Sequence, residues 1–178
     1  MGLLNPMATP RVFISSTCYD LSELRHGLES FVRSFGCSPV LSEHGDVFFH
    51  PDLHTHESCL KEVQNCQLMV LIIGGRFGGS YKCDPTKSVT NAEFNAAKEA
   101  KIPVFAFIKR DVWQDHFFYQ KNKEKRDFLK ELTFPAIERT DHAFQIFSFI
   151  DEVRLSPYNN ALLPFDSSSD LQELLEPV

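Results

Sequence analysis

Glu93 combines a residue type and a spacing that suit either catalysis or the start of a helix. The stretch Thr90-x-x-Glu93 matches a capping box, in which the Glu side chain returns to the backbone N–H of the Thr. Spacing alone favours this capping role. A carboxylate in the first turn of a helix, beside a glycine-rich loop, would instead face a crevice where a ligand can dock. Both roles stay open, and a catalytic Glu93 is expected to face an open crevice.

The glycine-rich loop lies before Glu93 and contains one arginine. Glycine pairs at positions 74–75 and 78–79 let the backbone approach a ligand closely and expose N–H groups. Arg76 can donate paired hydrogen bonds to a phosphate or a carboxylate. The loop matches neither G-x-x-x-x-G-K-[ST] nor a G-x-G-x-x-G that opens into a helix, so the usual fingerprints of ATP hydrolysis and of NAD redox binding are missing. A mobile turn with a structural arginine is the alternative interpretation.

Further polar residues follow the first apolar run. Ser15 and Ser16 can donate hydroxyl groups to a ligand, or satisfy backbone groups at the end of a strand. Asp20 can contact a ribose, but Thr17-x-x-Asp20 can equally cap the first helix, and the structural interpretation is favoured for this loop. Cys18 has no partner base in any sequence pattern, so we expect it to behave as a small buried hydrophobe.

Histidines, acidic residues and cysteines gather between positions 43 and 66. Imidazole and thiolate groups are zinc ligands, which makes a metal site worth testing. The spacing H-x-x-x-H-x-H has no second matched pair and differs from standard zinc sites. We therefore expect a polar loop at the edge of the sheet and no metal centre. The residues concerned are His44, Asp46, His50, Asp52, His54, His56, Cys59 and Cys66.

Length and composition predict one globular domain. The 178 residues are 43% hydrophobic and include 17 Phe, which is enough apolar side chain for a complete core. We expect a flexible segment at 1–9 and a single domain over 10–178. The net charge of -6 repels nucleic-acid phosphates and anionic lipids, so neither a nucleic-acid nor a membrane partner is expected.

Cysteine usage and the apolar runs predict a cytoplasmic protein. Five Cys are widely spread and form no C-x-x-C pair, which favours a reducing compartment over a disulfide framework. The start of the chain does not read as a signal peptide. The longest apolar run, 68–73, is far shorter than the roughly 20 residues that a membrane span needs.

Short apolar runs alternate with helical periodicity along the chain. Strands are expected at 11–15, 38–42, 68–73, 103–108 and 144–149. Helices are expected at 21–35, ended by Gly36, and then at 57–65, 91–100 and 111–132, with a last one capped within 167–170 and ending at 175. Loops are expected at 74–88 and 157–164.

This alternation predicts an α/β fold with a doubly wound, mainly parallel five-stranded sheet and helices on both faces. The run 68–73 shows no polar alternation, as expected of the central strand. Ligands bind such sheets at the carboxyl ends of the strands. The loops at 15–20 and 74–88 and the helix start at 90–93 should therefore share one edge of the sheet.

Three stretches on this edge resemble a known family. They read V-F-I-S-S-T-x-x-D-L from residue 12, I-G-G-R-F-G from residue 73 and S-V-T-N-A-E from residue 88. Together, over about 11–108, they resemble the TIR-like domain of unknown function often joined to bacterial STAND NTPases and defence proteins. This resemblance implies a flavodoxin-like fold related to TIR domains and to nucleoside 2-deoxyribosyltransferases. No STAND module follows in the sequence, so a sensing partner is expected to be separate or absent.

The resemblance also implies a site and a reaction. In both related groups a Glu on the helix after the third strand's loop acts at the ribose of a nucleotide or nucleoside, and Glu93 matches that place. Loss of nicotinamide from NAD develops oxocarbenium character that one carboxylate can stabilise, because the leaving group departs from a cationic pyridinium. Phe77 or Tyr81 would stack on a base, and the amides of the glycine-rich loop would hold the pyrophosphate. The implied ligand-binding residues are Ser15, Ser16, Asp20, Gly74, Gly75, Arg76, Phe77, Tyr81, Thr90 and Asn91.

The expected function is thus a TIR-like nucleotide N-glycosidase that cleaves NAD, as an NADase or cyclase, in bacterial stress or antiphage defence. NAD or a related nucleotide is the substrate, and no cofactor is required. The resemblance implies a homo-oligomer or a separate sensor protein as partner. A non-enzymatic module that binds a nucleotide or mediates assembly is the first alternative, and a nucleoside deoxyribosyltransferase is the second.

Overall fold

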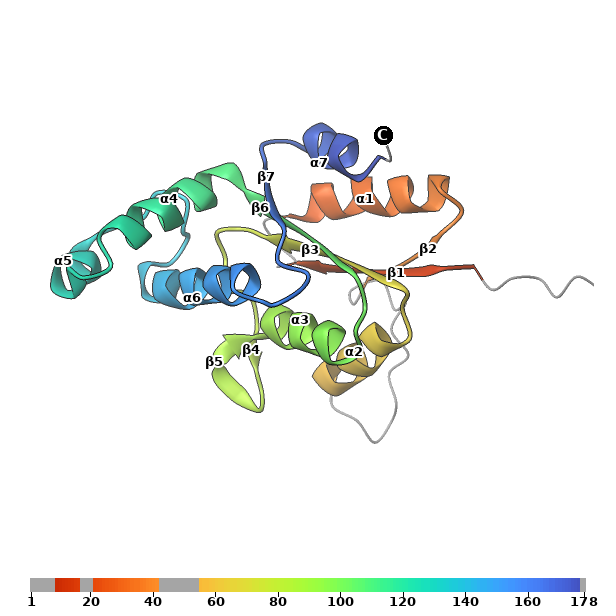
Figure 1. Ribbon diagram of the computed structural model, residues 1–178, viewed down its shortest axis with the longest axis horizontal. Helices are drawn as coiled ribbons and strands as arrows, with labels where there is room; N and C mark the ends of the chain where they lie inside the picture. The colour runs from red at the N-terminus through yellow and green to blue at the C-terminus, as the bar shows by residue number, and fades with distance from the viewer. Residues whose placement is uncertain (1–8, 17–20, 42–54, 177–178) are drawn as a thin grey trace, which may run out of the picture.

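The computed structural model describes residues 9–16, 21–41 and 55–176, and leaves the side chains of Thr55 and His56 undescribed (Figure 1). Its main element is a five-stranded sheet in the order β2-β1-β3-β6-β7, in which every neighbouring pair is parallel. The predicted α/β fold class is therefore confirmed. The strands are β1 (Arg11–Ser16), β2 (Ser38–Val40), β3 (Leu68–Ile73), β6 (Val104–Lys109) and β7 (Leu162–Phe165).

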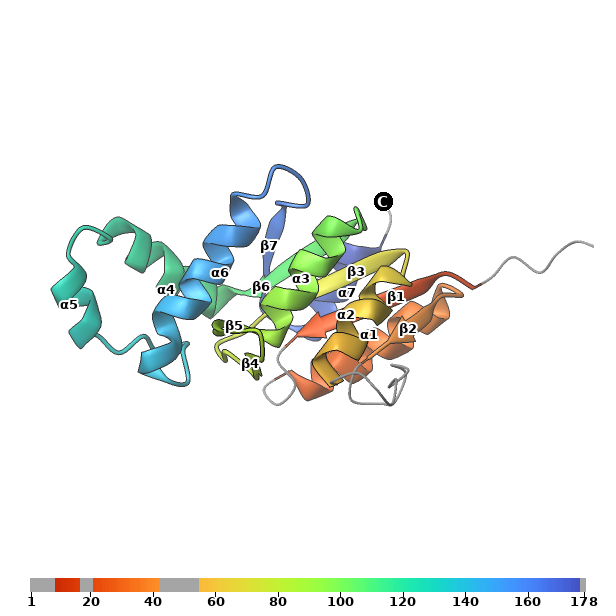
Figure 2. The same cartoon turned by 90° about the horizontal axis from the view of Figure 1, so that it is seen from below.

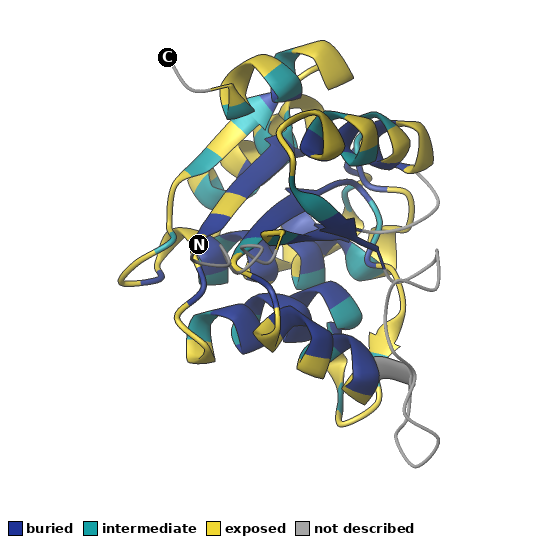
Figure 3. Cartoon of the chain, turned by 90° about the vertical axis from the view of Figure 1, so that its right-hand side faces the viewer, coloured by how far each residue is buried: buried dark blue, intermediate teal, exposed yellow. Residues whose placement is uncertain are grey.

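Helices cover both faces of the sheet (Figures 1 and 2). One face packs against α1 (Ser22–Ser34) and α7 (Ser168–Leu175), which also contact each other. The opposite face packs against α2 (Thr55–Gln64), α3 (Val89–Glu99) and α6 (Ala143–Arg154). Figure 3 shows the buried residues concentrated in the strands and on the helix surfaces turned toward them.

Side-chain alternation along β1 divides the core into two halves. Val12 and Ile14 are buried with the α1 and α7 side, whereas Phe13 is buried with the α2, α3 and α6 side. β3 lies in the middle of the five strands, and its last five residues are buried, as predicted from the apolar run. The carboxyl ends of β1 and β3 therefore meet at one edge of the sheet.

The prediction of the fifth strand was wrong. Residues 144–149, expected as a strand, lie in α6, and the loop expected at 157–164 contains most of the real fifth strand, β7. The buried side chains of α6 continue at helical spacing beyond the predicted segment, through Ile150 and Val153. β7 includes Pro164, which an edge strand tolerates because its outer N–H groups need no partner strand.

Two other regions differ from the prediction in detail. The helix expected at 111–132 is divided into α4 (Arg110–Lys121) and α5 (Arg126–Glu131). The loop expected at 74–88 contains a small antiparallel hairpin of β4 (Ser80–Tyr81) and β5 (Asp84–Ser88). A short 3-10 turn, η2 (Thr140–His142), precedes α6.

Several helix ends agree with the sequence. Gly36 adopts φ +72° after Phe35, the C-cap of α1, so the predicted left-handed end of that helix is confirmed. The Ser167 side chain accepts a hydrogen bond from the Asp170 N–H at the start of α7, as expected of a cap. Within the described ranges, no helix combines the length and apolar character needed to cross a membrane.

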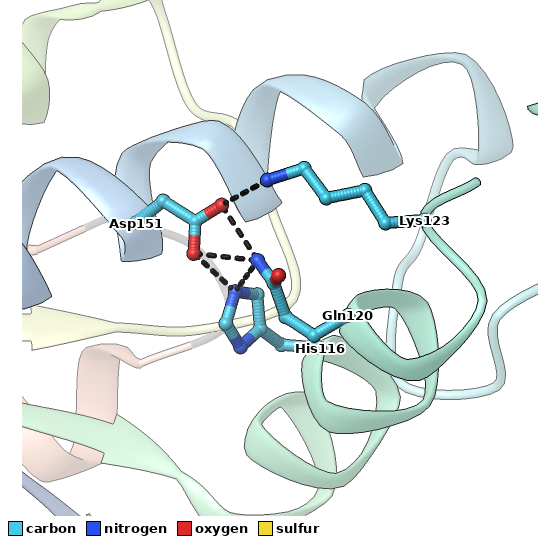
Figure 4. Close-up of polar contacts among 4 residues, drawn as sticks. All are labelled: His116, Gln120, Lys123 and Asp151. Atoms are coloured by element: carbon cyan, nitrogen blue, oxygen red, sulfur yellow. Dashed lines mark hydrogen bonds and ion pairs between the residues drawn. The ribbon is translucent and has the colours of Figure 1, made fainter.

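A polar cluster around the buried side chain of His116 fastens α4 to α6 (Figure 4). His116 Nε2 lies 2.9 Å from Asp151 Oδ1, and the Gln120 amide donates to both Asp151 oxygens at 2.7 and 2.6 Å. Lys123 Nζ lies 3.5 Å from Asp151 Oδ2. Burial lowers the pKa of His116, although the hydrogen bond to Asp151 acts in the opposite direction.

This cluster predicts a loss of stability in mild acid. Because the folded-state pKa of His116 lies below 6.5, the unfolded chain takes up the proton first, and the free energy of unfolding decreases as the pH falls from about 6.5 through the folded pKa. Urea unfolding at pH 7.5 and pH 5 measures this loss. We expect it to be smaller in His116→Phe than in the wild type.

His26→Gln is the control, because His26 is exposed on α1. It should lose as much stability between the two pH values as the wild type. An equal loss of stability in the wild type and in His116→Phe would contradict the assignment of this pH dependence to His116.

Candidate functional site

Glu93 and Ser15 form a buried pair at the carboxyl edge of the sheet. The Ser15 hydroxyl, near the end of β1, donates a hydrogen bond of 2.6 Å to Glu93 Oε2 on α3. Ser15 is 1% exposed and Glu93 is 4% exposed. A hydrogen bond to a carboxylate that is shielded from water is stronger than one at the surface. This pair orients the carboxylate and also ties α3 to β1.

Glu93 takes no part in capping α3, because other residues form the cap. Ser88 is the N-cap, its hydroxyl accepts from the Asn91 N–H at 3.2 Å, and its own N–H donates to Asn91 Oδ1 at 3.2 Å. The helix therefore begins at Val89, and Thr90 already lies inside it. The capping box predicted from Thr90-x-x-Glu93 is wrong, because the helix begins two residues earlier than the sequence suggested.

The expected open crevice is also wrong for this conformation. Glu93 is buried and does not line the cavity at the start of α3, whose volume of about 20 Å³ holds one water molecule and not a sugar. The cavity nevertheless brings together five residues that the sequence singled out. They are Gly74, Arg76, Phe77, Thr90 and Asn91.

A second buried polar contact lies on the other face of β1. Arg25, on α1, is 1% exposed, and its Nη1 donates to Ser16 Oγ at 2.6 Å and to the Ser16 carbonyl at 3.3 Å. Because successive side chains of a strand point to opposite faces, Ser15 faces α3 while Ser16 faces α1. Sequence reasoning missed Arg25. The available signal was its position between Leu24 and Leu28 on the apolar face of α1.

The glycine-rich loop packs against the chain segment before α6. A Cβ placed on Gly75 would lie 1.8 Å from the Ala136 carbonyl oxygen, and the Gly75 carbonyl accepts from the Glu138 N–H at 3.0 Å. Arg76 forms a 2.6 Å ion pair with Glu138. Gly75 is therefore needed for the close approach of two backbone segments, which is a structural role for that glycine.

Phe77 and Tyr81, the two aromatic residues considered for base stacking, differ in their surroundings. The Phe77 ring is 6% exposed and lies 5.0 Å from the His142 ring. Tyr81 lies on the hairpin and outside the cavity lining, and a hydrogen bond with the Cys83 side chain raises its pKa. Asp20 lies outside the described residues.

Most residues considered for a metal site lie outside the described part of the chain. His44, His50 and His54 are not described, nor is the side chain of His56. Cys59 and Cys66 are buried in the core, and burial raises the pKa of the Cys66 thiol to about 11. Cys66 is thus a protonated core residue near neutral pH, rather than the thiolate that binds zinc.

Comparison with known proteins identifies a family but no activity. A family model described as a domain of unknown function (DUF4062) matches residues 11–177. No curated protein was found to match the chain. The match covers the whole sheet and all the helices around it, and its description names no substrate.

The close approach at Gly75 predicts that alanine lowers the free energy of unfolding more at Gly75 than at Gly79. Gly75→Ala should lower the free energy of unfolding by about 1–3 kcal/mol, because the new Cβ overlaps a backbone carbonyl that cannot rotate away. Gly79→Ala is the control, since its Cβ would meet only Val89 Cγ2 at an ordinary 3.7 Å. Urea unfolding of both variants checks the prediction, and equal stabilities would contradict it.

Proposed function

The chain belongs to the DUF4062 family, and we propose that it is a nucleotide N-glycosidase that cleaves the nicotinamide–ribose bond of NAD, with Glu93 as the catalytic carboxylate. The observation that carries this proposal is the hydrogen bond from Ser15 to Glu93 at the ligand-binding edge of the sheet. Ser88 and Asn91 already cap α3, so the cap does not account for Glu93. The resemblance to TIR-like domains supports the choice of a ribose as the reacting group.

The reaction needs one carboxylate and one water molecule. The bond between ribose C1′ and the pyridinium nitrogen breaks, and its electron pair leaves with neutral nicotinamide. The sugar becomes oxocarbenium-like, and the negative charge of Glu93 stabilises it. Water then bonds to C1′ and releases a proton, which gives ADP-ribose. Ser15 acts as a positioning residue that holds the carboxylate in one orientation.

Access to Glu93 requires a change from the present conformation. The carboxylate is 4% exposed, and neither Glu93 nor Ser15 lines the cavity at the start of α3. Substrate must therefore reach the pair through a movement of the segments packed around it or through assembly with another copy. The resemblance supports assembly, and with it a cytoplasmic role in bacterial stress or antiphage defence.

A specific observation also favours a second candidate function. Burial of the Ser15–Glu93 pair suits a structural tie between β1 and α3 in a non-enzymatic module that binds a nucleotide or a partner domain. In that case Glu93→Gln lowers stability but leaves nucleotide binding intact, and no turnover occurs at any oligomeric state.

Nicotinamide release by the purified protein, dilute and at high concentration, tests the enzymatic proposal. Glu93→Gln should lower the rate by about 10²–10³-fold, because it removes the charge that stabilises the transition state. Ser15→Ala should lower it by about tenfold, since the carboxylate loses a charge-assisted hydrogen bond.

Glu99→Gln is the matched control, because it neutralises an exposed Glu near the other end of α3 and should leave the rate unchanged. A Glu93→Gln protein as active as the wild type would reject the catalytic role. Absence of release at every concentration would favour the non-enzymatic module.

A further inference from the structure

Residues 138–142, named the strap below, lie against the glycine-rich loop. The strap runs between two buried residues, Ile137 and Ala143, and its side chains from Glu138 to Asp141 are exposed. Its contacts with the loop come from its two ends. Glu138 contacts Gly75 and Arg76, and His142 contacts Phe77.

Glu138 places an anion on the guanidinium of Arg76. The two side chains lie 2.6 Å apart, with 36% of Arg76 and 49% of Glu138 exposed. A guanidinium binds a carboxylate and a phosphate through the same donors. Arg76 therefore already holds the type of group that a nucleotide would offer it.

His142 places a flat heteroaromatic ring on Phe77. The ring centroids are 5.0 Å apart with an interplanar angle of 42°. The Phe77 ring is 6% exposed, and the half-buried imidazole is one of the groups packed against it. A nucleobase offers the same kind of contact. Arg76 and Phe77 are consecutive, and both line the small cavity beside α3.

We propose that the strap is a built-in occupant of a nucleotide subsite, in which Glu138 takes the place of a phosphate on Arg76 and His142 takes the place of a base on Phe77. The inference rests on the site of the proposed function and adds its regulation. A nucleotide displaces the strap from Arg76 and Phe77, which both line the cavity of about 20 Å³. The ion pair adds little to the cost of displacement, because both of its partners are exposed. The nucleotide must also replace the backbone hydrogen bond from Glu138 to Gly75 and the contact of half-buried His142 with Phe77.

Titration calorimetry with ADP tests this competition. Glu138→Gln keeps the backbone N–H that binds Gly75 but removes the anion from Arg76, so ADP should bind about two- to fivefold more tightly, the range that one exposed ion pair supplies. His142→Ala should also tighten ADP binding. Arg76→Gln should weaken ADP binding and abolish the effect of Glu138→Gln.

Asp141→Asn is the matched control, because Asp141 lies in the strap but pairs with Arg139 instead of the loop. It should leave ADP affinity unchanged. The proposal is overturned if Glu138→Gln binds ADP no more tightly than the wild type, if Asp141→Asn tightens binding equally, or if ADP binds none of these proteins. ADP has no nicotinamide–ribose bond, so its binding tests the strap independently of the reaction. ADP binding as expected, together with no nicotinamide release from NAD, would reject the proposed reaction while leaving the strap proposal intact.

Discussion

A buried hydrogen bond between a serine hydroxyl and a carboxylate joins β1 to α3, and the geometry of the candidate site depends on it. A carboxylate removed from water is destabilised unless hydrogen bonds compensate for its lost solvation. Ser15 supplies one such bond to Glu93 at 2.6 Å. The strand register holds the donor, since Ser15 pairs with Leu71 of the central strand. The capping box of Ser88 and Asn91 holds the acceptor by setting where α3 begins.

The end of β1 carries a second contact of the same kind on its opposite face. Ser16 binds the buried guanidinium of Arg25, so two consecutive hydroxyls hold a carboxyl group on one side of the sheet and a guanidinium on the other. This arrangement follows from the two-residue period of a strand. A shift of register by one residue would exchange the two faces and place each hydroxyl beside the wrong helix. The parallel pairing of β1 with β2 and β3 prevents such a shift.

The glycine-rich loop in turn depends on a distant part of the chain. Gly75 lies too close to the Ala136 carbonyl for any side chain, and Arg76 is paired with Glu138. These contacts close the loop over a cavity the size of one water molecule. The groups that suit an anionic ligand are thus assembled, and Arg76 among them is already paired with a carboxylate. The segment between Ile137 and Ala143 contacts the loop at Gly75, Arg76 and Phe77, and the sequence pattern did not connect this segment with the site.

Much of the fold was readable from local patterns, because buried parallel strands and amphipathic helices leave strong signals. The run 68–73, the helix ended by Gly36 and the cap at Ser167 are all present in the structure. The fifth strand was misassigned, because apolar residues of α6 also fit a short alternating window, whereas β7 contains a proline. For the site, sequence alone brought Gly74, Arg76, Phe77, Thr90 and Asn91 to one edge, since strand ends in a parallel sheet must meet there.

Tertiary structure decided what those residues touch. A buried hydrogen bond, an ion pair or a close backbone approach joins segments far apart in the chain, and no local spacing encodes it. Only the folded chain could assign Glu93 as the partner of Ser15 and Glu138 as the partner of Arg76. The cap of Ser88 by Asn91 has a local spacing of three residues, but the structure decided that α3 begins there and not at Thr90.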